Sequence, residues 1–123
     1  MAVMGEIKSY RDLVVWQKSM ALVREIYLVS RNFPKEEQFG LTQQLRRAAV
    51  SIPSNIAEGN GRGSNSDYVR FLQYSRGSLF ETQTQLELCR DLGFLSDQNH
   101  NPLAALGSEI ERMLNTIISR FSS

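Results

Sequence analysis

The apolar residues of this chain recur at spacings of three and four along almost its whole length. This period places them on one face of an α-helix, whereas a half-buried strand would alternate apolar and polar residues. Three prolines and a few glycine clusters interrupt the pattern, and the stretches between them predict helices at about 11–32, 38–60, 65–92 and 102–121. Because the predicted connections are short, we expect one domain, 1–123, folded as an all-α, up-down-up-down four-helix bundle.

The first predicted helix has an unusually wide apolar arc. One stripe consists of Leu13, Trp16, Met20, Val23 and Tyr27, and a second of Val15, Leu22, Ile26, Val29 and Phe33. Together they cover roughly 200°, whereas a helix packed only into its own bundle needs an apolar stripe of little more than about 100°. This surplus predicts a second contact surface, and we favour self-association over burial by neighbouring helices alone.

The second predicted helix contains a proline in its middle. Pro53 stands in the segment RRAAVSIPSNIAEGNGR, between Ile52 and Ile56 of the apolar face. A proline inside a helix removes a backbone donor and clashes with the preceding turn, so we expect the helix to kink at Pro53. Ser51 and Asn55 lie close enough in sequence to shape or hydrate the break.

Local signals predict where the last two helices begin and end. Ser64, followed three residues later by Asp67, can form a capping box at the start of the third helix, and Gly93 is a fitting stop. Asn101 followed by Pro102 predicts the start of the fourth helix. Between these signals the third helix keeps a seven-residue repeat typical of coiled-coil-like packing, which comprises Tyr68, Leu72, Ser75, Leu79, Thr82, Leu86, Cys89 and Gly93.

The charge of the chain is nearly balanced but unevenly placed. There are 14 basic and 13 acidic side chains, a balance that argues mildly against a dedicated nucleic-acid domain. Residues 8–76 carry 11 basic and 6 acidic side chains, so an anionic partner should meet the first half. The single cysteine rules out an intramolecular disulfide, and neither a signal-peptide pattern nor a membrane-length apolar run is present. These features predict a cytoplasmic protein without membrane contact.

Little in the sequence predicts catalysis. His100 is the only histidine and falls in a predicted connection, where it is expected to be an exposed surface residue. Cys89 lies on the apolar stripe, where a free cysteine behaves as a small hydrophobe. The run Gly59-x-Gly61-x-Gly63 follows a helix and lacks the Gly-Lys-Ser/Thr ending of a phosphate loop. We therefore expect no enzymatic activity, no cofactor, no metal and no small-molecule substrate.

A line of polar residues along the second helix is the remaining signal. Its members are Gln44, Arg47, Ser51, Asn55, Glu58 and Arg62. Three interpretations stay open for this line: a solvated face, a hydrogen-bond network at a subunit interface, or direct ligand contact. Arg76, beside Gly77 in the third helix, raises the interface interpretation again, because a mid-helix glycine admits another backbone at a cost of up to about 1 kcal/mol.

Three stretches resemble a known bacterial family of four-helix bundles. YRDLVVWQKSMALVREIY, FPKEEQFGLTQQLRRAAVSIPSNIAEGNGR and YVRFLQYSRGSLFETQTQLELCRDLGFL are similar to the 23S rRNA-intervening-sequence proteins over about residues 9–96. The residues of the second helix that match the family pattern are Arg46, Arg47, Ser51, Pro53, Asn55, Glu58 and Gly59. Arg76 departs from the small or apolar residue that usually precedes GSL, which puts its packing role in doubt.

The resemblance implies a homopentamer of up-down-up-down bundles and assigns no catalytic residue. The chain also resembles, more distantly, the accessory proteins of diversity-generating retroelements, which are pentamers that bind nucleic acid and a reverse transcriptase through basic surfaces. We therefore expect a non-enzymatic homo-oligomer that binds RNA or another nucleic acid weakly. The alternative is a protein-interaction scaffold that binds no nucleic acid.

The two functional interpretations use different residues. The candidate nucleic-acid contacts are the basic side chains Arg46, Arg47, Arg62, Arg70 and Lys18, which do not fall on one helical line. The candidate interface and polar-network residues are Ser51, Asn55, Glu58, Arg76, Trp16 and Tyr27. Under the scaffold interpretation the arginines serve subunit contacts alone.

Overall fold

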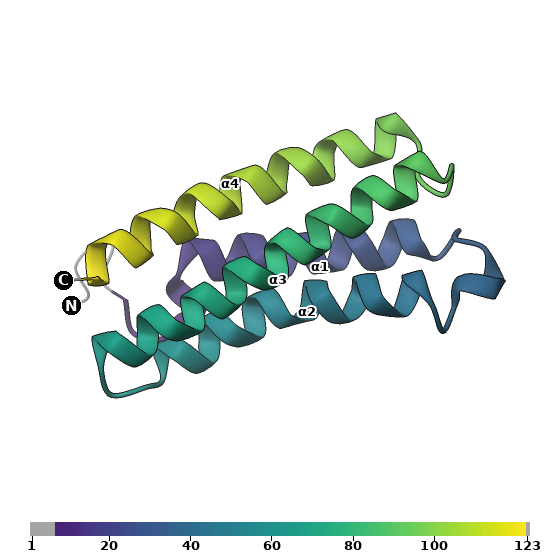
Figure 1. The fold of residues 1–123 in the computed structure, drawn as a ribbon. Helices are drawn as coiled ribbons and strands as arrows, with labels where there is room; N and C mark the ends of the chain where they lie inside the picture. Colours follow the sequence, from purple (N-terminus) through teal and green to yellow (C-terminus); the bar gives the residue numbers. More distant parts are fainter. Residues whose placement is uncertain (1–6, 123) are drawn as a thin grey trace.

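The computed structural model describes residues 7–122, which form an all-α four-helix bundle as predicted. The long helices are α1 (Val14–Ser30), α2 (Leu41–Asn60), α3 (Asn65–Asp91) and α4 (Asp97–Phe121). Two 3₁₀ turns, η1 (Tyr10–Asp12) and η2 (Lys35–Glu37), precede α1 and α2. Figure 1 shows the helices side by side, with the α1–α2 and α3–α4 connections at one end and the α2–α3 connection at the other, so the topology is up-down-up-down.

The core follows the predicted seven-residue repeat of α3. The residues of this repeat that are buried are Tyr68, Leu72, Ser75, Leu79, Thr82, Leu86 and Cys89. From α2, Leu45, Ile52 and Ile56 join the same core. A strict seven-residue period keeps one seam facing the neighbouring helices over the whole length of α3, which suits the near-parallel packing seen in Figure 1.

The two apolar stripes of α1 are buried to different degrees. Val15, Leu22 and Ile26 of one stripe are buried. In the other stripe, Trp16 and Val23 are partly buried against the core and Tyr27 is exposed. The fold of one chain therefore leaves part of the wide apolar arc of α1 uncovered. Self-association through this surface stays a prediction.

Pro53 lies inside α2, which runs without a break from Leu41 to Asn60. The kink predicted at Pro53 is not confirmed, and it stays a prediction. Asn55 does act close to the proline, because its Nδ2 donates to the carbonyl oxygen of Ser51 at 2.8 Å and to the Ser51 hydroxyl at 2.9 Å.

The helix boundaries confirm one sequence signal and correct another. Gly93 adopts a positive φ of 80° after α3, and the backbone bonds from Gly93 to Arg90 and from Phe94 to Cys89 form a Schellman motif. The predicted start of α4 at Asn101 is wrong. The helix begins five residues before Pro102, at Asp97, because the Ser96 hydroxyl accepts a bond from the Asn99 backbone and caps it earlier.

One of the two hydrogen bonds of the capping box predicted at the start of α3 is formed. The Ser64 hydroxyl accepts from the backbone N–H of Asp67 at 3.1 Å. The Asp67 carboxylate pairs with Arg70 at 3.1 Å. The cap still fixes where α3 begins. Along the described helices, no segment is both long enough and apolar enough to cross a bilayer.

Candidate functional site

A hollow that contains two arginines lies between α1 and the first half of α2. We call it the Arg46 groove. Its volume is about 620 Å³ and its lining residues are Tyr27, Gln38, Phe39, Thr42, Gln43, Arg46, Arg47, Val50 and Ser51. The groove thus brings together two of the four arginines predicted as nucleic-acid contacts, Arg46 and Arg47, and two of the predicted interface residues, Tyr27 and Ser51.

The guanidinium of Arg46 is held in a defined position. Its Nε donates to the hydroxyl of the buried Ser30 at 2.9 Å, and its Cζ lies 4.6 Å from the ring centroid of Tyr27. A guanidinium whose Nε is occupied still presents Nη1 and Nη2 as a two-pronged donor, the geometry that suits a phosphate or a carboxylate. Arg46 is therefore oriented by α1 while its outer edge stays available for a ligand.

The groove carries positive charge without a neutralising acid. No carboxylate is among its lining residues. Within residues 7–122, neither Arg46 nor Arg47 forms an ion pair. Arg46 is half-buried and Arg47 is exposed, and two adjacent arginines without carboxylate partners make a local field that attracts anions.

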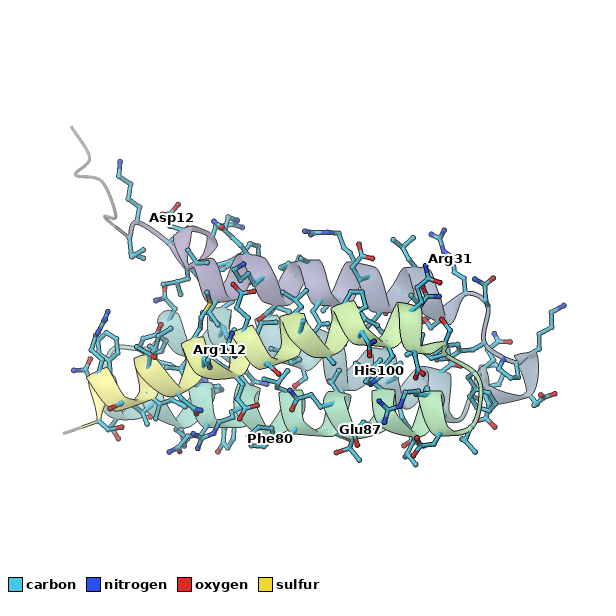
Figure 2. The ribbon with its side chains drawn as sticks, turned by 90° about the horizontal axis from the view of Figure 1, so that it is seen from above. Asp12, Arg31, Phe80, Glu87, His100 and Arg112 are labelled. Atoms are coloured by element: carbon cyan, nitrogen blue, oxygen red, sulfur yellow. The ribbon has the colours of Figure 1, made fainter. Side chains whose placement is uncertain are left out.

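A second, smaller hollow adjoins the groove and shares Gln38, Thr42 and Arg46 with it. Its volume is about 190 Å³, and it adds Arg31 and Lys35 from the α1–α2 connection. Figure 2 shows Arg31 at the end of α1 where this connection begins. The sequence analysis did not select Arg31 or Lys35, although the excess of basic residues in the first half of the chain is the signal that includes them.

Thr42 lines both hollows and has an unsatisfied hydroxyl. The residue is only 6% exposed, and its Oγ1 has no hydrogen-bond partner among the described residues. A buried hydroxyl without a partner costs about 1–3 kcal/mol, so such a group is usually explained by a ligand or an ordered water. Helical periodicity does not single out this threonine, because a single threonine is common in an amphipathic helix.

Phe39 lines the groove and is 81% exposed. It lies in the connection just before α2. There Glu37 fixes the chain, because its Oε1 accepts a bond from the Leu41 backbone at 3.1 Å. Aromatic residues are enriched where proteins contact a partner, and this ring lines the same groove as the two arginines. Its signal in the sequence is an aromatic residue inside the polar connection PKEEQFG.

The other three predicted nucleic-acid contacts lie elsewhere and are already paired. Arg62 contacts Glu58 at 3.0 Å and Arg70 contacts Asp67 at 3.1 Å, at the far end of α2 from Arg46. Both guanidinium groups also lie over the ring of Phe71, at 4.7 Å and 5.3 Å from its centroid.

Lys18 faces α4, where it contacts Glu109 at 2.8 Å. The candidate contacts therefore do not form one surface. Arg46 and Arg47 are the two that share a groove.

The polar network predicted around Pro53 joins helices within one chain. The Ser51 and Ser78 hydroxyls lie 2.9 Å apart across α2 and α3, and the buried Ser75 donates to the Ile52 carbonyl at 2.9 Å. Ser51 thus takes part in the α2–α3 contact, and Asn55 bonds Ser51 within α2. Part of the predicted polar line therefore makes hydrogen bonds within one chain, and these bonds need no second subunit.

The two remaining interface candidates also have partners in the chain. Arg76 of α3 donates to the Asn115 side chain of α4 at 2.8 Å. Trp16 packs edge-to-face on Tyr10, with ring centroids 5.2 Å apart. Gly77, beside Arg76, is exposed, and a Cβ added there would meet no atom of the described chain within 4 Å.

His100 is not the exposed loop residue that the sequence predicted. It lies in the first turns of α4 and is 5% exposed, with no hydrogen-bond partner for Nδ1 among the described residues. Figure 2 shows it on α4 beside the α3 helix that carries Glu87. The prediction was wrong because the earlier cap at Ser96 places His100 on the inner face of the helix.

Cys89 is buried as expected. Burial, and secondly the negative charge of Glu37, raises the pKa of its thiol to about 11. A thiol with this pKa is almost entirely protonated near neutral pH, so it is a poor nucleophile. Within residues 7–122, no three His, Cys, Asp or Glu side chains gather as a metal site would require.

Comparisons with known proteins point to one family. The model of a family described as 23S rRNA-intervening sequence protein matches residues 11–116. A crystal structure from Bacteroides thetaiotaomicron, described as a protein of unknown function from the S23 ribosomal protein family, is similar with a TM-score of 0.77 and 26% identity. The similarity covers 85% of this chain and 98% of that one. No curated protein matches the sequence.

Proposed function

The chain belongs to the 23S rRNA-intervening sequence protein family, and from this premise we propose that it is a non-enzymatic, self-assembling bundle that binds RNA through the Arg46 groove. The observation that carries the proposal is the groove itself. It brings Arg46 and Arg47 together, without a carboxylate, on the half of the chain that holds the excess of positive charge.

RNA binding by such a groove is electrostatic in origin. Each phosphate contacted by an arginine releases condensed counterions, so affinity falls as the salt concentration rises. Two arginines per chain make a weak site. Several copies in one assembly strengthen it, because each added contact becomes intramolecular once the first has formed.

Self-assembly is supported by apolar surface that the single chain leaves uncovered. Tyr27 and Leu28 of α1 are exposed, as are Tyr74, Phe80 and Leu88 of α3. Aromatic side chains are enriched in subunit interfaces. Five copies is the number that the family resemblance implies, and we propose the cytoplasm as the compartment.

The test is the affinity for a fluorescent RNA of about 20 nucleotides, measured by anisotropy over a salt titration. Replacing Arg46 and Arg47 together by glutamate should weaken binding at least tenfold at low salt, because two phosphate contacts turn repulsive. Arg112→Glu combined with Arg120→Glu is the matched control. These two replacements make the same charge change on the exposed surface of α4, and neither residue lines the groove.

The outcomes separate the competing functions. Absence of binding at low salt, or binding that salt does not weaken, overturns the RNA proposal. The scaffold alternative is favoured by the packing of Arg46 on Tyr27, because arginine and tyrosine often dominate the binding energy of protein interfaces. Light scattering on the double variant tests this alternative. If the variant loses mass, the arginines serve subunit contacts. An unchanged mass with lost RNA affinity supports the proposed function.

A further inference from the structure

We infer that the Arg46 groove is specific for single-stranded RNA, with a backbone phosphate held at Arg46 and an unstacked base lying on the ring of Phe39. This inference rests on the proposed RNA binding and adds the form of RNA that the groove accepts. It is carried by three features of the groove: an oriented guanidinium, an unpartnered hydroxyl and an exposed aromatic ring.

The phosphate half of the site is built from α2. Arg46 is fixed at its Nε by Ser30, which leaves Nη1 and Nη2 to grip two phosphate oxygens. Thr42 lies one helical turn before Arg46 and lines the same groove. Its Oγ1 is buried and has no partner among residues 7–122, and a rotation of the side chain about χ1 would bring the hydroxyl into the groove to donate to a third oxygen. Arg47, exposed beside them, adds a positive charge to the same anion.

The base half of the site is Phe39. The Tyr27 ring already has Arg46 over one face, whereas Phe39 is 81% exposed. Bases stack on exposed aromatic rings with little regard for sequence, since every base has a π-face. Phe39 precedes Thr42 by three residues and lines the same groove, so ring and phosphate donors face one ligand.

The combination of phosphate donors with an exposed aromatic ring selects against a duplex. The bases of an A-form helix are stacked and paired, so they cannot lie on a protein ring, whereas single strands and loops can splay their bases outward. The volume of about 620 Å³ is within the range of about 300–1,000 Å³ that small-ligand sites occupy, enough for a nucleotide. A groove that needed only phosphates would bind both forms of RNA, and Phe39 would then contribute nothing.

The test compares a single-stranded RNA with a duplex of the same length and with a single strand that carries abasic sites. Wild-type protein should bind the ordinary single strand at least about fivefold more tightly than the abasic strand, the loss expected from one base stack. Phe39→Ala should remove this preference and leave duplex affinity unchanged, and Phe39→Trp should restore it. Leu92→Ala is the matched control, because Leu92 is 58% exposed at the end of α3 and belongs neither to the groove nor to the apolar surface proposed for assembly.

Each other result has a defined meaning. If wild-type protein binds single strand, duplex and abasic strand equally, the inference is overturned and the proposed RNA binding stands. If it binds none of them at low salt, both fail. If Phe39→Ala lowers the mass in light scattering, Phe39 is a subunit contact and the inference is overturned.

Discussion

Gly59 of α2 lies directly against Phe71 of α3. A Cβ added at residue 59 would lie 2.6 Å from the Cβ of Phe71, closer than two such atoms approach in proteins. The first glycine of the GNGRG run is therefore a packing residue that lets the ends of α2 and α3 come together. This contact explains the glycine without any phosphate ligand.

Gly59→Ala should destabilise the bundle by about 1–3 kcal/mol, the usual cost of overpacking a close contact. The added methyl group meets the Phe71 Cβ, which is anchored to the backbone and cannot turn away. Urea unfolding followed by circular dichroism measures the change.

Gly77→Ala is the matched control, because a Cβ there meets no atom of the described chain within 4 Å. We expect it to stabilise the monomer fold by about 0.5–1 kcal/mol, since alanine is the better helix former. Equal effects at the two positions would contradict the packing role of Gly59. A loss of assembly mass in Gly77→Ala would show instead that another subunit approaches α3 at this glycine.

The contact between Ser51 and Ser78 should be worth about 0.5–1.5 kcal/mol to the folding of a single chain. The two hydroxyls lie 2.9 Å apart across α2 and α3. A double-mutant cycle with Ser51→Ala and Ser78→Ala measures the coupling in the free energy of unfolding. Ser54→Ala is the control, since the Ser54 hydroxyl bonds only the Val50 carbonyl within its own helix. No coupling, together with a loss of assembly mass, would place Ser51 at a subunit interface.

The helix cap at Ser96 should stabilise the protein, and Asn101 should not. Ser96→Ala removes the hydroxyl that accepts the Asn99 backbone N–H, which typically costs about 1 kcal/mol. Asn101→Ala changes an exposed residue inside α4 and should have an effect below about 0.5 kcal/mol. Thermal unfolding of both variants checks this. A larger cost for Asn101→Ala would return the start of α4 to the position that the sequence predicted.

The misplaced start of α4 shows where sequence reasoning on this chain works and where it stops. Seven of the eight residues predicted for the α3 stripe are buried, because a seven-residue period depends only on helix geometry, and the eighth, Gly93, is exposed beyond the end of the helix. The α4 boundary depended on a choice between two capping signals, Ser96 and Asn101. Proline after the second signal favoured it, because proline is common at the first helical position. In the structure Pro102 is instead the sixth residue of α4 and lies inside the helix. With the start placed at Asn101, His100 fell in a connection and was expected to be exposed, whereas a start at Asp97 places it inside the helix.

The candidate site was predictable only in part, for a different physical reason. Arg46 and Arg47 stand out in sequence as two adjacent arginines in the second predicted helix. Arg62 and Arg70 differ from them because each forms an ion pair with a carboxylate in the folded chain. Residue spacing in the sequence does not show which arginines form such pairs. Thr42 and Phe39 join the site through the packing of α1 against α2. Contacts between helices are tertiary, so helical periodicity alone does not identify them.

Cys89 should react with thiol reagents only when the protein unfolds. The side chain is buried, and the pKa of its thiol is raised to about 11, so little thiolate exists at pH 8 in the native state. Labelling with a chromogenic disulfide at pH 8 should proceed at the rate of opening in buffer and become rapid in 8 M urea. Fast labelling of the folded protein would contradict the burial of Cys89.

The same thiol should make stability fall at high pH. Its pKa in the folded protein, about 11, is above the value of 9.0 for an unperturbed thiol, so its contribution is fully present below pH 9 and is lost as the pH rises through about 11. Other groups also titrate there, including Tyr68, whose burial raises its phenol pKa. Cys89→Ala isolates the thiol, because the variant retains those groups. Between pH 9 and 11 the free energy of unfolding should therefore decline more steeply in wild-type protein than in Cys89→Ala, and parallel curves would show that the thiol titrates alike in both states.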